Sequence, residues 1–259
     1  VENIVSRLAI HYGNNPTVIG WQIDNEPGHY GVVDYSENAQ AKFRIWLQKK
    51  YGTIDKLNDT WGASFWSETY QNFEQVRLPN QQEVPDKANP HAMLDLNRFM
   101  ADELAGFVNM QADILRRHIH KDQWITTNLI PIFNPVDPVR IDHPDFLTYT
   151  RYLVTGHNQG IGSQGFRMGI PEDLGFSNDQ FRNRVGKAFG VMELQPGQVN
   201  WGVYNPQPLP GAIRMWVYHV FAGGGKFVCN YRFRQPLKGS EQYHYGMIMT
   251  DGVTLSPGG

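Results

Sequence analysis

Residues 17–26 have the sequence Thr-Val-Ile-Gly-Trp-Gln-Ile-Asp-Asn-Glu, a short apolar run that ends in a carboxylate and precedes a Pro-Gly turn. Its β-branched and aromatic residues predict a buried strand over 17–25, of the kind that parallel sheets contain. In parallel barrels the active site is built at the carboxyl ends of the strands, where Glu26 would lie. The alternative is that Glu26 is an ordinary surface residue at the end of a strand.

The rest of the chain alternates similar runs with helical patterns. Two helices have recognisable starts, with Ser36 as the cap of one and Asn89-Pro90 at the beginning of a longer one. Alternating strands and helices predict an α/β fold with a parallel sheet and right-handed crossovers. Further strands are expected at 123–129, 146–153, 189–195 and 225–233, and helices at 1–12, 36–50, 54–58, from 90 onward, 176–188 and 209–222.

The five expected strands are too few to close a (β/α)8 barrel, which needs eight. Because the first strand comes only after an opening helix, we expect the chain to begin part-way round a barrel, as a fragment of a longer protein whose natural N-terminus is absent. Such a fragment would expose two sheet edges and half a core. We therefore expect residues 1–259 by themselves to be poorly stable and inactive.

The composition is that of an ordinary globular protein, with 41% hydrophobic and 19% charged residues among 259. The formal net charge of −2 gives no electrostatic reason to expect nucleic acid or an anionic membrane as a partner, and no apolar run is long enough to span a membrane. Cys229 is the only cysteine, which excludes an intrachain disulfide and a thiolate zinc site. The apolar run around Cys229 predicts a buried side chain, and the histidines form no metal-ligand pattern.

A second carboxylate interrupts one of the predicted strands. Glu193 lies within the run Gly190-Val-Met-Glu-Leu-Gln195, and an acidic residue in such a setting needs a partner or a task. A buried ion pair with Arg151 or Arg232 is one alternative. The other is glycoside hydrolysis, in which a retaining enzyme holds two carboxyl groups roughly 5 Å apart, one as proton donor and one as nucleophile. Converging strand ends would bring Glu26 and Glu193 together, although the residues alone do not assign the two roles.

Five stretches, spread over almost the whole chain, carry a resemblance to one known family. They are Val18-Ile-Gly-Trp-Gln-Ile-Asp-Asn-Glu26, Leu57-Asn-Asp-Thr-Trp-Gly-Ala-Ser-Phe-Trp-Ser67, Gly190-Val-Met-Glu-Leu-Gln-Pro-Gly-Gln-Val-Asn-Trp201, Tyr231-Arg-Phe-Arg-Gln235 and Ser240-Glu-Gln-Tyr-His244. In this order they are similar to glycoside hydrolase family 42, the microbial β-galactosidases. The resemblance implies a (β/α)8 barrel in which 17–25 is the fourth strand and 225–233 the eighth. Residues 1–259 would then be the C-terminal part of the catalytic barrel domain, without strands one to three.

The functional residues of the family fall on matching positions. Glu26 resembles the acid/base of a retaining β-galactosidase, and Glu193 resembles its nucleophile. The resemblance also implies substrate-binding roles for Asn25 beside the scissile bond, for the aromatic platforms Trp66 and Trp201, and for the galactose-binding pair Glu241 and His244. Core packing remains the alternative for the tryptophans, and a solvated loop pair for the last two residues.

The same resemblance implies partners, and its departures leave alternatives open. It implies a β-galactoside substrate, small or oligosaccharide, no cofactor, and a cytoplasmic homo-oligomer, in this family a trimer. The family's sixth strand resembles Ser-Trp-Asp-Asn-Tyr, whereas this chain has Leu147-Thr-Tyr-Thr-Arg-Tyr152; Phe233 replaces a usual Trp, and the cysteine cluster for zinc is missing. An α-L-arabinopyranosidase, a hydrolase of other galactose-containing oligosaccharides and a non-catalytic galactoside-binding derivative are therefore kept as alternatives.

Overall fold

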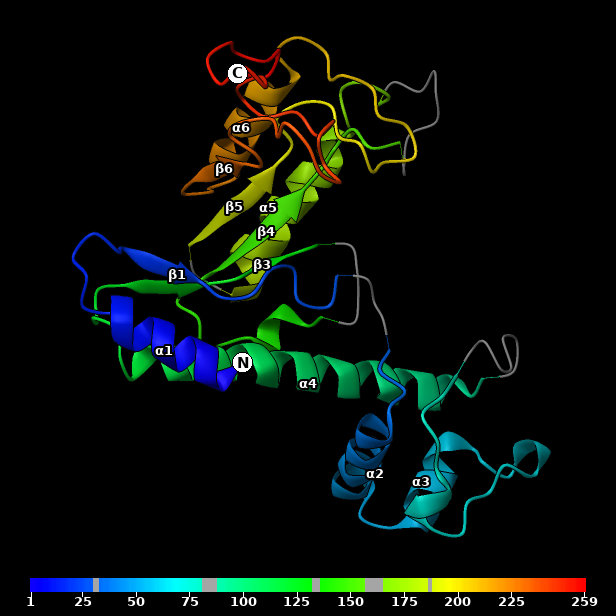
Figure 1. Cartoon of the computed structure of the whole chain (residues 1–259). Coiled ribbons are helices and arrows are strands. Elements are labelled where there is room, and N and C mark those ends of the chain that lie inside the picture. The colour runs from blue at the N-terminus through cyan, green and yellow to red at the C-terminus, as the bar shows by residue number, and fades with distance from the viewer. Residues whose placement is uncertain (30–32, 81–87, 132–135, 157–164, 186–187) are drawn as a thin grey trace. The chain divides into compact units, whose positions relative to one another are not determined.

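The computed structural model describes residues 1–29, 33–80, 88–131, 136–156, 165–185 and 188–259 (Figure 1). The chain divides into two compact units, and each is described by itself. The first unit comprises Val1–Pro27, Val108–Ile132 and Ile141–Gly259, and the second comprises Gly28–Phe107 and Phe133–Arg140.

The first unit is built on parallel strands. β1 pairs with β2, while β3, β4, β5 and β6 form a second sheet in chain order. The strands are β1 (Gly20–Gln22), β2 (Trp124–Thr126), β3 (Asn128–Leu129), β4 (Leu147–Arg151), β5 (Phe189–Leu194) and β6 (Val228–Asn230). Parallel strands that neighbour one another in chain order, with helices between most of them, are consistent with part of a (β/α)8 barrel, and the predicted α/β fold class is confirmed.

One predicted strand is divided. The run 123–129 forms β2 and β3, because pairing with β1 ends at Thr126 and pairing with β4 begins at Asn128. Between them, the carbonyl of Thr127 accepts hydrogen bonds from both the backbone N–H and the hydroxyl of Thr148, at 3.0 and 2.9 Å. The other strands are each shorter than the apolar run that predicted them.

Helices that lie wholly in the described part of the first unit are α1 (Glu2–Tyr12), α5 (Pro171–Val185) and α6 (Ala212–Ala222). Helix α5 begins five residues earlier than predicted because Pro171 occupies its first position, where the missing N–H costs nothing. Buried Tyr149 of β4 packs against Phe181 of α5, with ring centroids 5.1 Å apart, and its hydroxyl donates to Asn178 Oδ1 at 2.7 Å. Figure 1 shows α5 beside β4, and these contacts attach the helix to the sheet.

The second unit is helical, with α2 (Glu37–Tyr51), α3 (Ile54–Trp61), three short 3-10 turns and most of α4 (Pro90–Arg116), whose last residues belong to the first unit. The predicted caps are confirmed, since the Ser36 side chain accepts from Ala39 N–H and the Asn89 side chain from His91 N–H. The turns are η1 (Phe65–Ser67), η2 (Phe73–Gln75) and η3 (Pro138–Arg140). The core of this unit includes Phe43, Leu47, Leu57, Trp61, Leu96 and Phe99.

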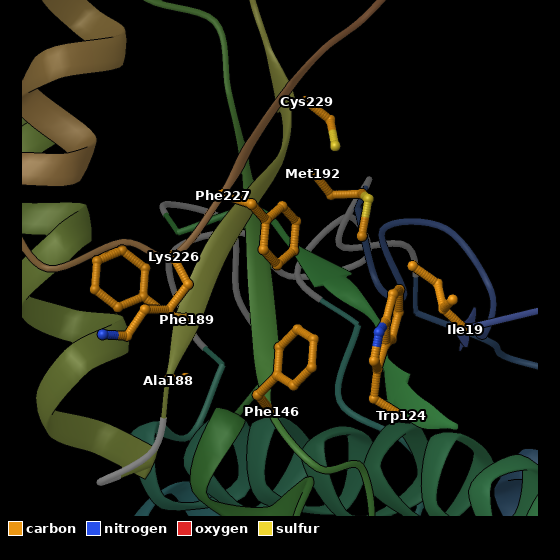
Figure 2. Close-up of a pocket in the computed structure, with 9 residues that line it drawn as sticks. All are labelled: Ile19, Trp124, Phe146, Ala188, Phe189, Met192, Lys226, Phe227 and Cys229. Atoms are coloured by element: carbon orange, nitrogen blue, oxygen red, sulfur yellow. The ribbon is translucent and has the colours of Figure 1, made fainter. Parts of the chain in front are cut away.

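An apolar cavity of about 470 Å³ lies at the amino ends of the strands (Figure 2). The rings of Trp124, Phe146 and Phe227 follow one another along it, with centroids 5.5 and 6.0 Å apart. Cys229 lines this cavity and is exposed, so the prediction that it is buried is wrong. The apolar run does contain a strand, but β6 is the last strand of the described sheet, and apolar neighbours in the sequence do not by themselves bury a side chain there.

Candidate active site

The two glutamates singled out by the sequence both lie at the carboxyl ends of strands in the first unit. Glu26 follows β1 in a tight turn in which Asp24 and Glu26 itself have φ values of 57° and 47°. Residues other than glycine rarely adopt this left-handed region, and such strain is concentrated at functional sites. The backbone N–H of Glu26 donates to Asn128 Oδ1 at 3.4 Å, which ties the turn to β3.

The carboxyl group of Glu26 is half-buried, and its surroundings favour the protonated form. Burial raises the pKa of Glu26 above its ordinary value, and a hydrogen bond with the Thr150 side chain acts in the opposite direction without outweighing burial. An upward shift is the direction that a carboxyl group acting as a general acid requires.

Glu193 owes its direction to a β-bulge. Val191 is the register partner of Tyr149 and Glu193 that of Thr150, so Met192 is one residue more than β4 can match. Bulges bend a strand and change the direction of its side chains, and they are common beside active sites. The hydroxyl of Tyr152 donates to Glu193 Oε2 at 2.8 Å.

The end of β4 interacts with both glutamates. Thr150 hydrogen-bonds the Glu26 side chain and is also the register partner of Glu193. The hydroxyl of Tyr152 bonds to Glu193, and its pKa is raised first by burial, then by the charge and hydrogen bond of Glu193, and also by the charge of Glu26. Two neighbouring residues at the end of β4, Thr150 and Tyr152, therefore connect Glu26 after β1 with Glu193 of β5.

The two arginines considered as alternative partners of Glu193 have other carboxylate partners. Arg151, which is buried, contacts Asp173 of α5 at 3.0 Å. Arg232 forms an ion pair with Glu241. The arginines thus stabilise the loops and the helix around the site.

Aromatic rings line the same end of the unit. Trp201 is 45% exposed and meets the ring of Tyr152 edge to face, with centroids 4.8 Å apart. His244 lies on Tyr152 as well, at 5.7 Å, and contacts Tyr231 at 5.6 Å. The predicted platform Trp201 is therefore beside the tyrosine that hydrogen-bonds Glu193.

Trp66 belongs to the second unit, where it is 64% exposed and stacks obliquely on Phe65 with centroids 4.9 Å apart. Its φ of 53° is again in the left-handed region. The role of Trp66 as a platform stays a prediction.

His244 is completely buried, which contradicts the solvated-loop alternative for this residue. Its Nδ1 is 3.1 Å from the Tyr245 carbonyl, and burial, chiefly, lowers the pKa of His244. The ring is therefore neutral with the proton on Nδ1, and Nε2 is a buried acceptor with no hydrogen-bond partner among the described residues. Glu241 Oε2 accepts from Tyr231 at 3.1 Å and pairs with Arg232.

Sequence reasoning missed four polar residues of this region: Asn128, Thr150, Tyr152 and Gln195. Gln195 is fully buried, and its side chain accepts from Leu153 and Val154 N–H at 2.9 and 2.8 Å while donating to the Val154 and Gly197 carbonyls. It therefore clamps the chain after β4 to the end of β5. The signal that could have found Thr150 and Tyr152 was the departure at 147–152, which was noted without a role.

Among the residues that the structure describes, no group of three or more histidine, cysteine, aspartate or glutamate side chains could hold a metal ion. No helix in those ranges has both the length and the apolar character needed to cross a bilayer.

The chain is similar in sequence and in fold to known β-galactosidases. A model of glycoside hydrolase family 42, described as β-galactosidase, matches residues 1–258. The chain is 36% identical over 255 residues to the β-galactosidase Bga of Halorubrum lacusprofundi, covering 96% of this chain and 36% of that protein. It is 36% identical over 258 residues to BgaA of a Thermus species, covering 96% and 39%. The solved β-galactosidase of the psychrophilic Marinomonas ef1 superimposes with a TM-score of 0.91 at 34% identity, covering 99% of this chain and 40% of that one.

Proposed function

The chain belongs to glycoside hydrolase family 42, and from that premise we propose that the protein hydrolyses terminal non-reducing β-D-galactosides with retention of configuration. The chain spans 36% to 39% of the length of the two curated relatives, so the activity is proposed for the whole protein. We further propose that residues 1–259 are the C-terminal part of its catalytic barrel domain.

The observation that carries the proposal is the contact of one strand end with both glutamates. Tyr152 donates to Glu193 and lies within the field of Glu26, while Thr150 bonds to Glu26. Two carboxyl groups in different surroundings around one point are what a retaining glycosidase needs. The raised pKa of Glu26 supports its role as the acid, and the Tyr152 hydrogen bond supports an ionised Glu193 as the nucleophile.

The reaction proceeds by two displacements. Glu26 gives its proton to the glycosidic oxygen while a Glu193 oxygen attacks the anomeric carbon, so that the bond to the leaving group breaks and a glycosyl ester forms. Glu26, now a carboxylate, takes a proton from water as that water attacks the same carbon. The ester bond breaks, Glu193 is again ionised, and the sugar leaves with its β configuration.

The surrounding groups match a galactose ring by their chemistry. The exposed indole of Trp201 offers a face for the C–H groups of a pyranose. The neutral His244 offers a lone pair on Nε2 to a sugar hydroxyl, which would satisfy the buried atom. Glu241 and Asn25 supply further hydroxyl partners, and Trp66 is kept as a second platform. Assembly as a homotrimer and a cytoplasmic location are proposals from the family resemblance, the first of which light scattering would test.

The test is azide rescue in the complete protein. Replacing Glu193 with Ala should lower hydrolysis of 4-nitrophenyl β-D-galactoside by several orders of magnitude, and azide should then attack the free anomeric carbon directly to give the α-galactosyl azide. Replacing Glu26 with Ala should give the β-galactosyl azide, because the ester still forms on Glu193.

Nearly full activity in the Glu193→Ala protein would overturn the assignment. A panel of nitrophenyl glycosides separates a β-galactosidase from an α-L-arabinopyranosidase, and galactoside binding without turnover by the unaltered protein would favour the non-catalytic derivative.

A further inference from the structure

We propose that Asn128, a buried side chain of β3, is a positioning residue that fixes the hydrogen-bond directions of Asn25 and Thr150, and through Thr150 the carboxyl oxygen of Glu26 that carries the acidic proton. The inference rests on the proposed function and deepens it.

Asn128 is fully buried and uses both ends of its amide. Its Oδ1 accepts from Gln22 Nε2 at 2.8 Å and from Glu26 N–H at 3.4 Å. Its Nδ2 donates to Asn25 Oδ1 at 3.0 Å and to Thr150 Oγ1 at 2.9 Å. A backbone N–H can only donate, so the contact with Glu26 identifies Oδ1 and settles which end of the amide faces which neighbour.

The direction of Asn25 follows from this assignment. The side-chain oxygen of Asn25, Oδ1, faces Asn128, so the NH₂ group of the same amide is directed elsewhere. Asn25 is exposed. A sugar hydroxyl beside the scissile bond would then meet a donor and not an acceptor.

The direction of the Thr150 hydroxyl follows in the same way. Its oxygen accepts from Asn128, so its own proton is the one available for the hydrogen bond with the Glu26 carboxyl. One oxygen of Glu26 is thereby occupied by a donor. When Glu26 is protonated, its proton resides on the other oxygen, which must face the glycosidic oxygen for the acid to act.

A purely structural role predicts something different. Loss of a buried amide or hydroxyl would lower stability and reduce activity on every substrate in the same proportion. If proton positioning is lost, the fall in activity should depend on the leaving group, because 4-nitrophenolate departs with little protonation whereas the alcohol of a methyl galactoside requires protonation.

The experiment compares 4-nitrophenyl and methyl β-D-galactoside in the complete protein carrying Asn128→Leu or Thr150→Val. We expect kcat/KM to fall about tenfold or more further for the methyl galactoside than for the nitrophenyl one. The ratio is independent of the folded fraction, so it remains valid if a variant is unstable. In Thr150→Val the alkaline limb of the pH profile should move to higher pH, because Glu26 loses a donor to its ionised form.

Matched controls are present in the same unit. Thr148 is a buried threonine of β4 whose hydroxyl donates to the Thr127 carbonyl, and Asn178 is a buried asparagine of α5. Thr148→Val and Asn178→Leu should lower stability without changing the substrate ratio, and Thr150→Ser should restore it. Equal losses on both substrates with an unmoved alkaline limb would overturn the positioning role alone. Absence of any galactoside hydrolysis by the unaltered protein would overturn the proposed function and this inference with it.

Discussion

Each unit holds a buried or half-buried carboxyl group, and the two groups have opposite surroundings. Asp95, in the second unit, accepts from Tyr51 at 2.5 Å and Trp61 at 3.1 Å and pairs with Lys50 and Arg98. Burial acts to raise the pKa of Asp95, but these donors and the charge of Lys50 outweigh it, and the pKa is lowered.

Glu26, in the first unit, has a side-chain donor in Thr150, and burial prevails over it, so the pKa of Glu26 is raised. Burial alone therefore does not decide what an acidic residue does. The number and charge of the donors around it decide whether it is an anion that holds helices together or an acid ready to give up its proton. Substitutions at either carboxyl group test this difference.

The largest effect is expected from Glu26→Gln. Removing the proton donor should lower kcat/KM for galactosides with poor leaving groups by about 10² to 10⁴-fold, while the free energy of unfolding stays the same or rises, because a poorly compensated acid is gone. Steady-state kinetics and urea unfolding of the complete protein measure the two quantities. A Glu26→Gln protein that loses stability and keeps its rate would contradict this comparison, because Glu26 would then have the stabilising role assigned to Asp95.

A smaller effect is expected from Asp95→Asn, and it should fall on stability and not on the rate. Neutralising this side chain leaves Lys50 without its ion-pair partner and should cost about 3 kcal/mol of unfolding free energy. The control is Glu103→Gln, whose ion pair with Lys42 is exposed and should contribute less than about 1 kcal/mol. Equal costs at the two positions would show that the donors around Asp95 do not stabilise the second unit.

The smallest effect is a difference between Asp95 and Glu26 in how each makes stability depend on pH. The pKa of Asp95 is lowered from the ordinary value of 3.8. The stability that the Asp95 carboxylate contributes is therefore present above pH 3.8 and is lost as the pH falls from there through the folded-state pKa. The pKa of Glu26 is raised, so stability is lost as the pH rises from 4.5 through its folded-state pKa. For each neutralised variant, the measurement is the difference in unfolding free energy from the unaltered protein as a function of pH. The two differences should change with pH in opposite directions, and changes in the same direction would contradict the comparison.

The sequence was sufficient for features that depend on neighbouring residues. The helix starts at Ser36 and Asn89 and the existence of the parallel strands follow from local chemistry, and the structure confirms them. The resemblance of the quoted stretches to one family is confirmed by the comparisons. The roles assigned to Glu26 and Glu193 remain predictions that the geometry supports.

Features that depend on distant residues escaped prediction. Asn128 and Gln195 look like ordinary polar residues at strand ends, and their partners are as far as 106 positions away in the sequence. Cys229 was placed in the core because its neighbours are apolar, although burial of a strand face depends on what covers that face. No periodicity reveals such a layer or a buried amide's partners.

The surplus residue in β5 has a consequence for the direction of Glu193. Side chains alternate along a regular strand, so Val191 and Glu193, two positions apart, would point to the same side of the sheet. Met192 reverses that parity, and the acidic group faces the side it does because β5 carries one residue more than β4. Deleting the single residue Met192 should therefore turn the Glu193 carboxylate to the other face of the sheet, while every acidic residue of the protein is kept.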